Sequence, residues 1–531
     1  MSAEVGLAVL GCAIISFALS AFQSRNSAGG GSDSPVHLFI IRAMRENGHR
    51  LFARIPGLIN DTRCGALPLY THWLLSFLPP SGLRYAERYL NPAINALHVL
   101  VVGVALTLTL SAGSMVASTL AALVVLFTLT PQLFHVLSAR NFGFSARGIG
   151  LLLLTLFFFA AYAVETDPRS IPAWAGLIAA SWLIWGFSTF GAQALCLLSI
   201  NMMATGHWGA SIGAVLGLVT FIAAHPRYSL AYLEYTARFI VAYRTELAPI
   251  YILSRRPSIW RDLVADIWIR LRRDLTSGLR YAYENSVMIA VVLTPVTLIA
   301  AIVAITGWNA LVDPLISYAG SVALAGVIAA FATSFRPTRF LGEPERYLEA
   351  VAPWGAVAGG IAILGWFGLP GLGAVVALFS VLVAGQMVGV RMLAGRMGGS
   401  RHDLAEVVRA IDRRFGREAR VCCNNEQITK LLMRNDWRFS CFLVVGQSYC
   451  GLTPTEAFSV FPYLTSRSCE HIAARNRINA LLLDRTLYED VFAQRPADLE
   501  SVVTGFEDAN FRLLFLTWRD EPIPVDLVAA D

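Results

Sequence analysis

An acidic residue and a histidine stand four positions apart at the start of a short amphipathic stretch near the N-terminus. Asp33 comes directly before Ser34-Pro35, and His37 follows one helical turn later. If a helix begins at Ser34 or Pro35, Asp33 lies near its N-terminus, where a carboxylate is stabilised as an anion. Such a carboxylate can accept a proton from a hydroxyl group. The alternative is a plain N-cap aspartate with no chemical role.

The residues that follow Asp33 recur at helical spacing. Apolar and polar side chains fall on opposite faces, with Val36, Phe39, Ile40 and Met44 on one and Arg42, Arg45 and Glu46 on the other. This pattern predicts a helix that lies along a membrane surface.

A second polar stretch lies in the same loop, at Pro68-Leu69-Tyr70-Thr71-His72-Trp73-Leu74. His37 and His72 can each hydrogen-bond a sugar or a phosphate group. Because each histidine lies among aromatic residues, the alternative is that it closes a packed interface.

A third polar stretch runs from Arg339 to Glu349, much later in the chain. Arg339 and Arg346 carry guanidinium groups, which pair with phosphate oxygens in a bidentate manner. Glu343, Glu345 and Glu349 lie in the same stretch. The alternative is therefore a surface of Arg–Glu pairs that neutralises itself.

The composition indicates how these loops are held. The chain has 531 residues, of which 56% are hydrophobic and 15% are charged, with a mean hydropathy of +0.57. This is too much apolar surface for a soluble core, so we expect an integral membrane protein. The net charge of +6 rests almost wholly on arginine, and no basic run is typical of nucleic-acid binding.

Apolar runs predict about eleven transmembrane helices. The first, Val5 to Phe22, is interpreted as a retained span, with a cleaved signal peptide as the alternative. The later runs are 93–111, 115–133, 148–164, 173–187, 192–204, 208–223, 287–305, 318–335, 351–367 and 372–390. Residues 1–392 thus form a membrane domain whose first loop spans 23–92.

Residues 226–286 differ from these runs because they are amphipathic. Residues 258–271 predict a helix in the membrane interface with tryptophans at headgroup level. Its role is either lipid recognition or simple connection.

Residues 393–531 are polar and predict a small soluble α/β domain. We expect helices at 404–415, 426–434 and 471–478, and strands at 419–423, 442–445 and 480–484. Five of the eight cysteines lie here, and their number and vicinal spacing favour buried free thiols over a disulfide framework.

The first span, the loop that opens with an acidic residue, and the many further spans with a soluble tail resemble the GT-C superfamily of glycosyltransferases. These enzymes use polyprenyl-phosphate-linked sugars. The likeness is strongest to bacterial members of the dolichyl-phosphate-mannose mannosyltransferase type, through residues 33–39, 68–74 and 339–349.

The resemblance implies a membrane enzyme that moves a sugar from a polyprenyl-phosphate donor to a lipid or glycan acceptor with inversion, in the inner membrane of a bacterium. It matches Asp33 to the general base. The predicted substrate-binding residues are His37, Tyr70, His72, Arg339, Glu343, Glu345 and Arg346. Some GT-C enzymes bind a divalent metal through a DxD-like pair, which Asp33-Ser34-Pro35 lacks. We therefore expect no cofactor, with a divalent metal as the less favoured alternative.

Two other classes fit a polytopic membrane protein. A transporter or lipid flippase usually carries ionisable residues inside its spans, whereas here they gather in loops. A membrane anchor with an active tail is disfavoured because the tail has no nucleotide or nucleophile motif. Arg391, Arg396 and Arg401 favour a cytoplasmic C-terminus. An odd number of spans then places the N-terminus outside and the first loop inside, whereas the resemblance requires the first loop outside. The cues agree only if the number of spans is even.

Overall fold

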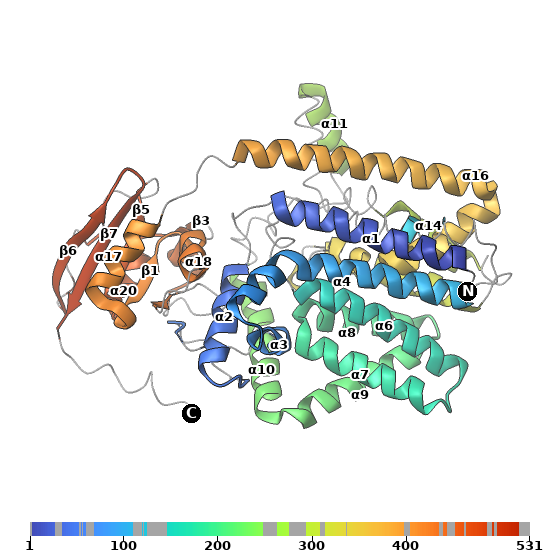
Figure 1. The fold of residues 1–531 in the computed structure, drawn as a ribbon, viewed down its shortest axis with the longest axis horizontal. Helices are drawn as coiled ribbons and strands as arrows, with labels where there is room; N and C mark the ends of the chain where they lie inside the picture. Colours follow the sequence, from blue (N-terminus) through green and yellow to red (C-terminus); the bar gives the residue numbers. More distant parts are fainter. Residues whose placement is uncertain are drawn as a thin grey trace.

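The computed structural model of the chain has a body of long helices and a smaller sheet-containing part beside one end of it (Figure 1). The structure describes residues 3–26, 34–51, 55, 57–59, 68–109, 119, 122–124, 146–247, 263–274, 294–307, 314–335, 337–342, 344–397, 404–434, 439–442, 452–460, 463–485, 491–492, 496 and 498–519.

Among these residues, five helices are long and apolar enough to cross a membrane. They are α1 (Ala3–Asn26), α4 (Pro80–Thr109), α6 (Ala146–Thr166), α15 (Pro314–Ser334) and α16 (Pro344–Met397). Helix α16 bends sharply at Gly368, where φ is 66°, and its second half runs back along the body (Figure 1).

Shorter apolar helices pack beside them: α7 (Ile171–Phe187), α8 (Thr189–Ala204), α9 (Gly209–Ala224) and α14 (Pro295–Thr306). The predicted helical membrane architecture is thus confirmed, while the count of about eleven spans stays a prediction. The run 115–133 lies largely outside the described residues. Helix α4 already begins at Pro80, inside the predicted first loop 23–92, because residues 80–92 continue the helix of the apolar run.

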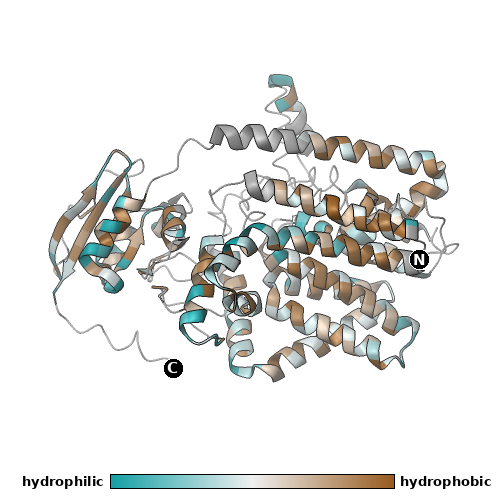
Figure 2. Cartoon of the chain, viewed as in Figure 1, coloured by the Kyte–Doolittle hydropathy of each residue, from teal (hydrophilic) through white to brown (hydrophobic). Residues whose placement is uncertain are grey.

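Small residues allow these helices to approach closely. A Cβ atom at Gly103 of α4 would lie 2.5 Å from Val9 of α1, and one at Gly326 of α15 would lie 2.2 Å from Val351 of α16. Such close backbone contacts are the usual way in which helices associate in lipid. Hydrophobic residues dominate the helices of the body (Figure 2), and Leu7 is among the large apolar side chains that are exposed.

Shorter helices gather at the end of the body that faces the sheet. They are α2 (Ser34–Glu46), α3 (Tyr70–Ser76), α10 (Pro226–Ala242), the π-helical turn η4 (Tyr243–Leu247) and the 3₁₀ turn η6 (Arg339–Leu341). The prediction of a helix after Asp33 is confirmed by α2. Its apolar face does not lie against lipid, however, because Phe39, Ile40 and Met44 are buried in the protein core.

The amphipathic segment contains α11 (Leu263–Arg273), which stands away from the rest of the chain (Figure 1). Trp268 and Ile269 are more than half exposed. The predicted helix is confirmed over these residues, while its lipid-binding or connecting role is open.

The C-terminal part is a five-stranded sheet in the order β2-β1-β5-β7-β6, with helices packed on it. The strands are β1 (Arg420–Cys423), β2 (Ser440–Cys441), β5 (Ala480–Asp484), β6 (Leu499–Glu507) and β7 (Phe511–Trp518). Strand β1 pairs in parallel with β2 and β5, and β7 pairs antiparallel with β5 and β6. A separate pair joins β3 (Phe458–Val460) to β4 (Tyr463–Leu464).

The helices of this part are α17 (Ala405–Phe415), the 3₁₀ turn η7 (Gly416–Glu418), α18 (Glu426–Arg434), α19 (Pro454–Ala457) and α20 (Ser466–Arg475). The helices at 404–415 and 426–434 and the strands at 419–423 and 480–484 are confirmed. The predicted helix 471–478 begins earlier, because the Thr465 side chain caps it by accepting a hydrogen bond from Ser468 N. The predicted strand 442–445 is wrong at Phe442, since β2 ends at Cys441, and residues 443–445 lie outside the described residues.

The hairpin of β6 and β7 was not predicted. Its turn is held by Asp508, whose Oδ1 accepts hydrogen bonds from the backbone N–H groups of Asn510 and Phe511 at 2.7 and 2.6 Å. The predicted free thiols are confirmed at Cys422, Cys423, Cys441 and Cys469, which are all buried.

The first loop and the C-terminal part lie at the same end of the body, because residue Leu58 pairs with Cys441 and α2 packs against α18. The N-terminus lies at the other end (Figure 1). An outside first loop and a cytoplasmic C-terminal domain therefore exclude each other, so one of the two orientation cues from the sequence is wrong.

Candidate functional site

Two predicted histidines contact each other directly. Nδ1 of His37 in α2 lies 2.8 Å from Nε2 of His72 in α3, within hydrogen-bonding distance. His72 is only 2% exposed. Burial, reinforced by the neighbouring charge of His37 and opposed by the carbonyl of Pro68, holds the pKa of His72 well below its usual range. His72 is therefore neutral at neutral pH, and the pair joins two helices of the first loop.

The first residue of α2 is tied to α4. The Ser34 hydroxyl donates a hydrogen bond to Glu87 Oε1 at 2.7 Å. Asp33 lies outside the described residues. The link to Glu87 holds the N-terminus of α2 against α4.

Helix α3 is held against α2 through its C-terminal end. The Arg45 guanidinium donates hydrogen bonds to the carbonyl groups of Ser76, at 3.1 Å, and of Leu78. A cation at the C-terminus of a helix pairs with its last carbonyl groups. His49 also reaches this end, with Nδ1 2.8 Å from Ser76 Oγ.

Tyr70 occupies an aromatic cluster. Its ring lies against Trp182, Phe187, Phe221 and His225, with centroids 5.7–6.2 Å apart. The backbone N–H of the preceding residue, Leu69, donates to the hydroxyl of Tyr228 at 2.9 Å. These contacts give Tyr70 a packing role, and substrate binding by Tyr70 stays a prediction.

A second polar group lies where α6, α8 and α16 meet. The Arg147 guanidinium forms an ion pair with Glu349, and both side chains are at most 10% exposed. Arg147 Cζ lies 5.6 Å from the Phe190 ring centroid, and Arg346 Cζ lies 5.8 Å from the same centroid. Two guanidinium groups thus share one aromatic ring, in the geometry of cation–π contacts.

The turn before α16 is fixed by its backbone. Gly342 has a φ of +117°, which other residues rarely adopt. The carbonyl oxygen of Leu341 accepts hydrogen bonds from the side chains of Gln193 and Tyr347. Arg339 lies in this turn, in η6, and Glu345 is buried in the first turn of α16. Glu343 and the Arg339 side chain lie outside what the structure describes.

The two polar groups belong to the same end of the body. A Cβ atom at Gly148, next to Arg147, would lie 3.7 Å from Asn91 Oδ1, one helical turn after Glu87 in α4. A Cβ atom at Gly150 would lie 2.5 Å from Ser188 Oγ, at the N-terminus of α8. The packing of α4, α6 and α8 therefore links the α2–α3 histidine pair to the group that contains Arg147 and Arg346.

Arg147 was not predicted. It directly precedes the apolar run 148–164, where a basic residue is the usual flank of a transmembrane helix. Its sequence position gives no sign that it faces Glu349, more than two hundred residues later.

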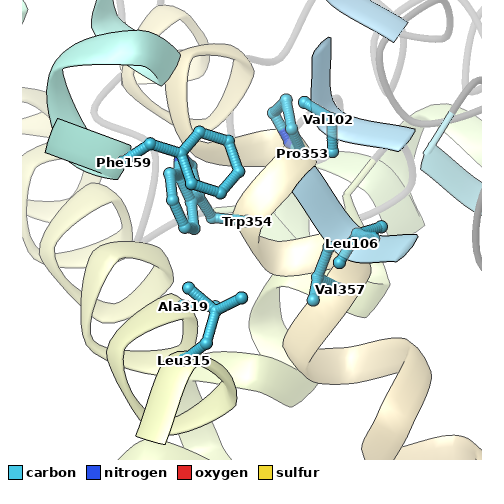
Figure 3. Close-up of a pocket in the computed structure, with 8 residues that line it drawn as sticks. All are labelled: Val102, Leu106, Phe159, Leu315, Ala319, Pro353, Trp354 and Val357. Carbon is cyan, nitrogen blue, oxygen red and sulfur yellow. The ribbon is translucent and has the colours of Figure 1, made fainter. Parts of the chain in front are cut away.

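An apolar cavity lies deeper in the body, between α4, α6, α15 and α16 (Figure 3). Its lining has no ionisable side chain; the residues are Val102, Leu106, Phe159, Leu315, Ala319, Pro353, Trp354 and Val357. The lining of this cavity thus offers no group for proton transfer or charge stabilisation.

The fold has counterparts among solved structures. The archaeal oligosaccharyltransferase AglB from Archaeoglobus fulgidus, in complex with an inhibitory peptide and a dolichol-phosphate, matches 90% of this chain and 69% of its own, with a TM-score of 0.53 and 10% identity. AglB is a GT-C superfamily glycosyltransferase. The GT-C resemblance is confirmed at the level of the fold.

Two further structures of the A. fulgidus oligosaccharyltransferase agree. The apo form covers 90% of this chain and 69% of its own, with a TM-score of 0.54 and 12% identity. The complex with Zn and sulfate covers 89% of this chain and 68% of its own, with a TM-score of 0.55 and 11% identity. A scan of protein-family models and a search of curated proteins found no match.

The part of the chain that the structure describes has no group of three or more His, Cys, Asp or Glu side chains that could hold a metal ion. Asp33 and Glu343 lie outside that part. The described residues thus offer no ligand set for the metal seen in the A. fulgidus enzyme, and metal independence stays a prediction from the sequence.

Proposed function

We propose that this chain is an integral membrane glycosyltransferase that moves a sugar from a polyprenyl-phosphate donor to a lipid or glycan acceptor. The observation that carries the proposal is the combination of a GT-C fold with two polar groups at one end of the helical body. The dolichol-phosphate in the AglB complex supports a lipid-phosphate donor.

In this proposal Asp33 is the general base. An acceptor hydroxyl is a weak nucleophile and must lose its proton as it attacks the anomeric carbon. A positioned carboxylate contributes on the order of 10²- to 10⁴-fold to such a step. Attack from the face opposite the lipid phosphate forms the new glycosidic bond, breaks the bond to the phosphate and inverts the configuration. The hydrogen bond from Ser34 to Glu87 supports this role, because it anchors the chain next to Asp33.

The leaving lipid phosphate needs positive charge. Arg346 meets that need together with Arg147, since both guanidinium groups reach Phe190 at the same end of the body. Fixed cations that face a developing negative charge lower the barrier without rearranging during the reaction. Arg339 is a third candidate from the adjacent turn. His37, Tyr70, His72, Glu343 and Glu345 remain proposed substrate-binding residues.

The alternative, a self-neutralising surface of Arg–Glu pairs, is supported at Arg147. Glu349 pairs with Arg147, as that alternative predicts. Arg346, however, lies over the ring of Phe190 within the same group. In the proposed reaction, the two guanidinium groups donate hydrogen bonds to the singly charged phosphodiester of the donor and to the lipid phosphate that leaves with a second negative charge.

The proposed topology has about eleven spans within residues 1–392, followed by a soluble domain at 393–531. The proposed mannosyltransferase-like activity places the first loop outside the cytoplasm, in the inner membrane of a bacterium. Since α2 packs against α18, the C-terminal domain then also lies outside.

A transporter or lipid flippase is the second candidate. Transport by ionisable residues requires polar groups that are available to a cargo inside the spans. His98 in α4 is such a residue, but its Nε2 lies 2.7 Å from Thr155 Oγ1 and the side chain is buried. This contact favours a structural role for His98, and so favours the enzyme.

The deciding experiment is transfer from a radiolabelled polyprenyl-phosphate sugar by membranes that contain the protein. We expect Asp33→Asn to lower the rate on the order of 10²- to 10⁴-fold. The exposed Asp167, in the turn after α6, gives the matched control Asp167→Asn with an unchanged rate. Full activity of Asp33→Asn would remove Asp33 from the mechanism.

A binding measurement tests the class itself. The purified protein should bind a polyprenyl-phosphate sugar, and Asp33→Asn should retain that binding because the base acts on the acceptor. Failure of the wild-type protein to bind any such lipid would contradict the proposed function.

A further inference from the structure

The first loop extends the sheet of the C-terminal part. The backbone N–H of Cys441 in β2 donates to the carbonyl of Gly57 at 2.9 Å, and the N–H of Ile59 donates to the carbonyl of Cys441 at 2.9 Å. Leu58 and Cys441 form the corresponding parallel bridge. Residues 57–59 thus continue the sheet beyond β2.

These hydrogen bonds do not compete with those inside the sheet. The neighbouring N–H groups point the other way, with Ser440 N donating to Ala419 O at 2.9 Å and Phe442 N donating to Val421 O at 2.8 Å. Both main-chain groups of Cys441 are therefore used by the first loop. The free edge of β2 is covered by the membrane domain's own chain.

The side chains of the same segment join the two cores. Ile55 is buried in the core that includes α2, whereas Ile59 is buried in the C-terminal core with Phe442 and Leu481. Gly57, between them, has a φ of +78°, and a Cβ there would lie 3.0 Å from Phe39 Cζ of α2. The segment is thus fitted between α2 and the sheet.

A second contact reinforces the first. Helix α18 packs on α2, and the two appear together between the sheet and the body in Figure 1. Ile428, Leu432 and Met433 of α18 are buried in the same core as Phe39 and Ile40 of α2. This helix is the one whose N-terminus follows Asp33 and which carries His37.

We propose that the C-terminal domain is a positioning element of the candidate site: it holds residues 57–59 on β2 and α2 on α18, and so sets the place of the α2 N-terminus. The domain then contributes to transfer without contributing a group that touches the substrate. The effect on transfer rests on the proposed function, whereas the placement of α2 does not.

Cross-linking tests the placement. In Leu58→Cys the new thiol faces Cys441, and oxidation with copper phenanthroline should join them. A protease site is inserted within residues 398–403, so that cleavage releases the C-terminal part from the rest of the chain. The two fragments then run as one band on a non-reducing gel only if a disulfide joins them. We expect linkage in Leu58→Cys, and none in Leu58→Cys/Cys441→Ser or in Arg50→Cys, which lies in the same loop. Equal behaviour of all three variants would overturn the proposal.

A pair of glycine variants tests the consequence. Gly57→Ala strains a positive φ and presses on Phe39, whereas Gly48→Ala strains a φ of +69° with no atom within 4 Å. We expect faster amide hydrogen exchange in residues 34–46 for Gly57→Ala than for Gly48→Ala. Transfer should fall on the order of tenfold to a hundredfold more for Gly57→Ala, because small displacements of reacting groups are costly.

The readouts separate the two proposals. Equal exchange of residues 34–46 in both variants, or faster exchange in Gly57→Ala with an unchanged transfer rate, would overturn the positioning role. If the wild-type protein transferred no sugar at all, the proposed function would fail, while cross-linking and exchange would still decide the placement of α2.

Discussion

The two ends of α6 carry polar pairs that differ in burial and in their surroundings. At the last turn, Glu165 accepts a hydrogen bond from Gly209 N at 2.9 Å and lies 2.7 Å from His207 Nδ1. At the first turn, Arg147 pairs with Glu349, beside the second guanidinium of Arg346 over Phe190.

This difference indicates a structural role for the pair at the last turn of α6. Both carboxylate oxygens of Glu165 have protein partners, so the pair at that end joins α6 to α9 and is complete in itself. At the other end, two guanidinium groups lie over one ring, and Glu345 and Glu349 are buried in the first turns of α16. A buried ion pair alone is weak evidence of function. Under the proposed function, the second guanidinium group binds the lipid phosphate at this end.

The largest expected effect is at the arginine end. Arg346→Ala should lower kcat for transfer from a polyprenyl-phosphate sugar on the order of 10²- to 10³-fold, as loss of a preorganised electrostatic contact does. The kcat of Arg346→Lys should lie between those of the wild type and Arg346→Ala, because lysine keeps the charge but lacks the planar guanidinium group. Arg169→Ala, exposed after the last turn of α6, is the matched control with an unchanged rate. Equal rates for all three variants would remove the functional difference between the two ends.

The next effect is on stability. Glu349→Gln leaves the buried Arg147 without its partner and should cost about 3–5 kcal/mol, measured by unfolding in detergent. Glu165→Gln should cost less, about 1–3 kcal/mol, because Glu165 and His207 are only partly buried and only hydrogen bonds are lost. The double variant Arg147→Gln/Glu349→Gln should recover much of the loss. A larger cost for Glu165→Gln would reverse the comparison.

The sequence predicted what local periodicity determines. Helix α2, helices α17 and α18 and strand β5 follow from apolar spacing and capping residues, and the predicted bounds lie close to those observed. The approach of His37 to His72 was not predictable, because it depends on how α2 and α3 fold back on each other. From the sequence alone, each histidine could bind a ligand or close a packed interface.

Non-local contacts explain the other misses. In the sequence, Arg147 has the position of a basic residue that flanks a transmembrane helix. Its contact with Glu349 depends on the packing of α6 on α16. The predicted membrane-surface role of α2 was wrong for a similar reason, since α18 supplies the apolar partner that lipid would otherwise provide. The β6–β7 hairpin did carry a local signal, in the Asp508 turn between two alternating stretches.

A smaller effect concerns pH and the first loop. The native pKa of His72 lies below that of an unfolded histidine, about 6.5, because burial disfavours its charged form. Below about pH 6.5 the unfolded chain binds a proton that native His72 does not, so stability falls by up to about 1.4 kcal/mol per pH unit. Melting temperatures from pH 7.5 to pH 5 should fall less steeply in His72→Gln. His471→Gln, exposed on α20, should keep the wild-type slope; an unchanged slope in His72→Gln would contradict a neutral buried His72.

The smallest expected effect is that of metal removal. In the proposed reaction Arg147 of α6 and Arg346 of α16 supply the positive charge that the lipid phosphate needs, so no divalent cation is required there. Treatment with excess EDTA should leave the transfer rate within about twofold of its initial value, well inside the tenfold change that 1.4 kcal/mol of barrier represents. A loss of tenfold or more that Mg²⁺ or Mn²⁺ restores would show that a metal, rather than the second guanidinium, distinguishes this end of the helix from the other.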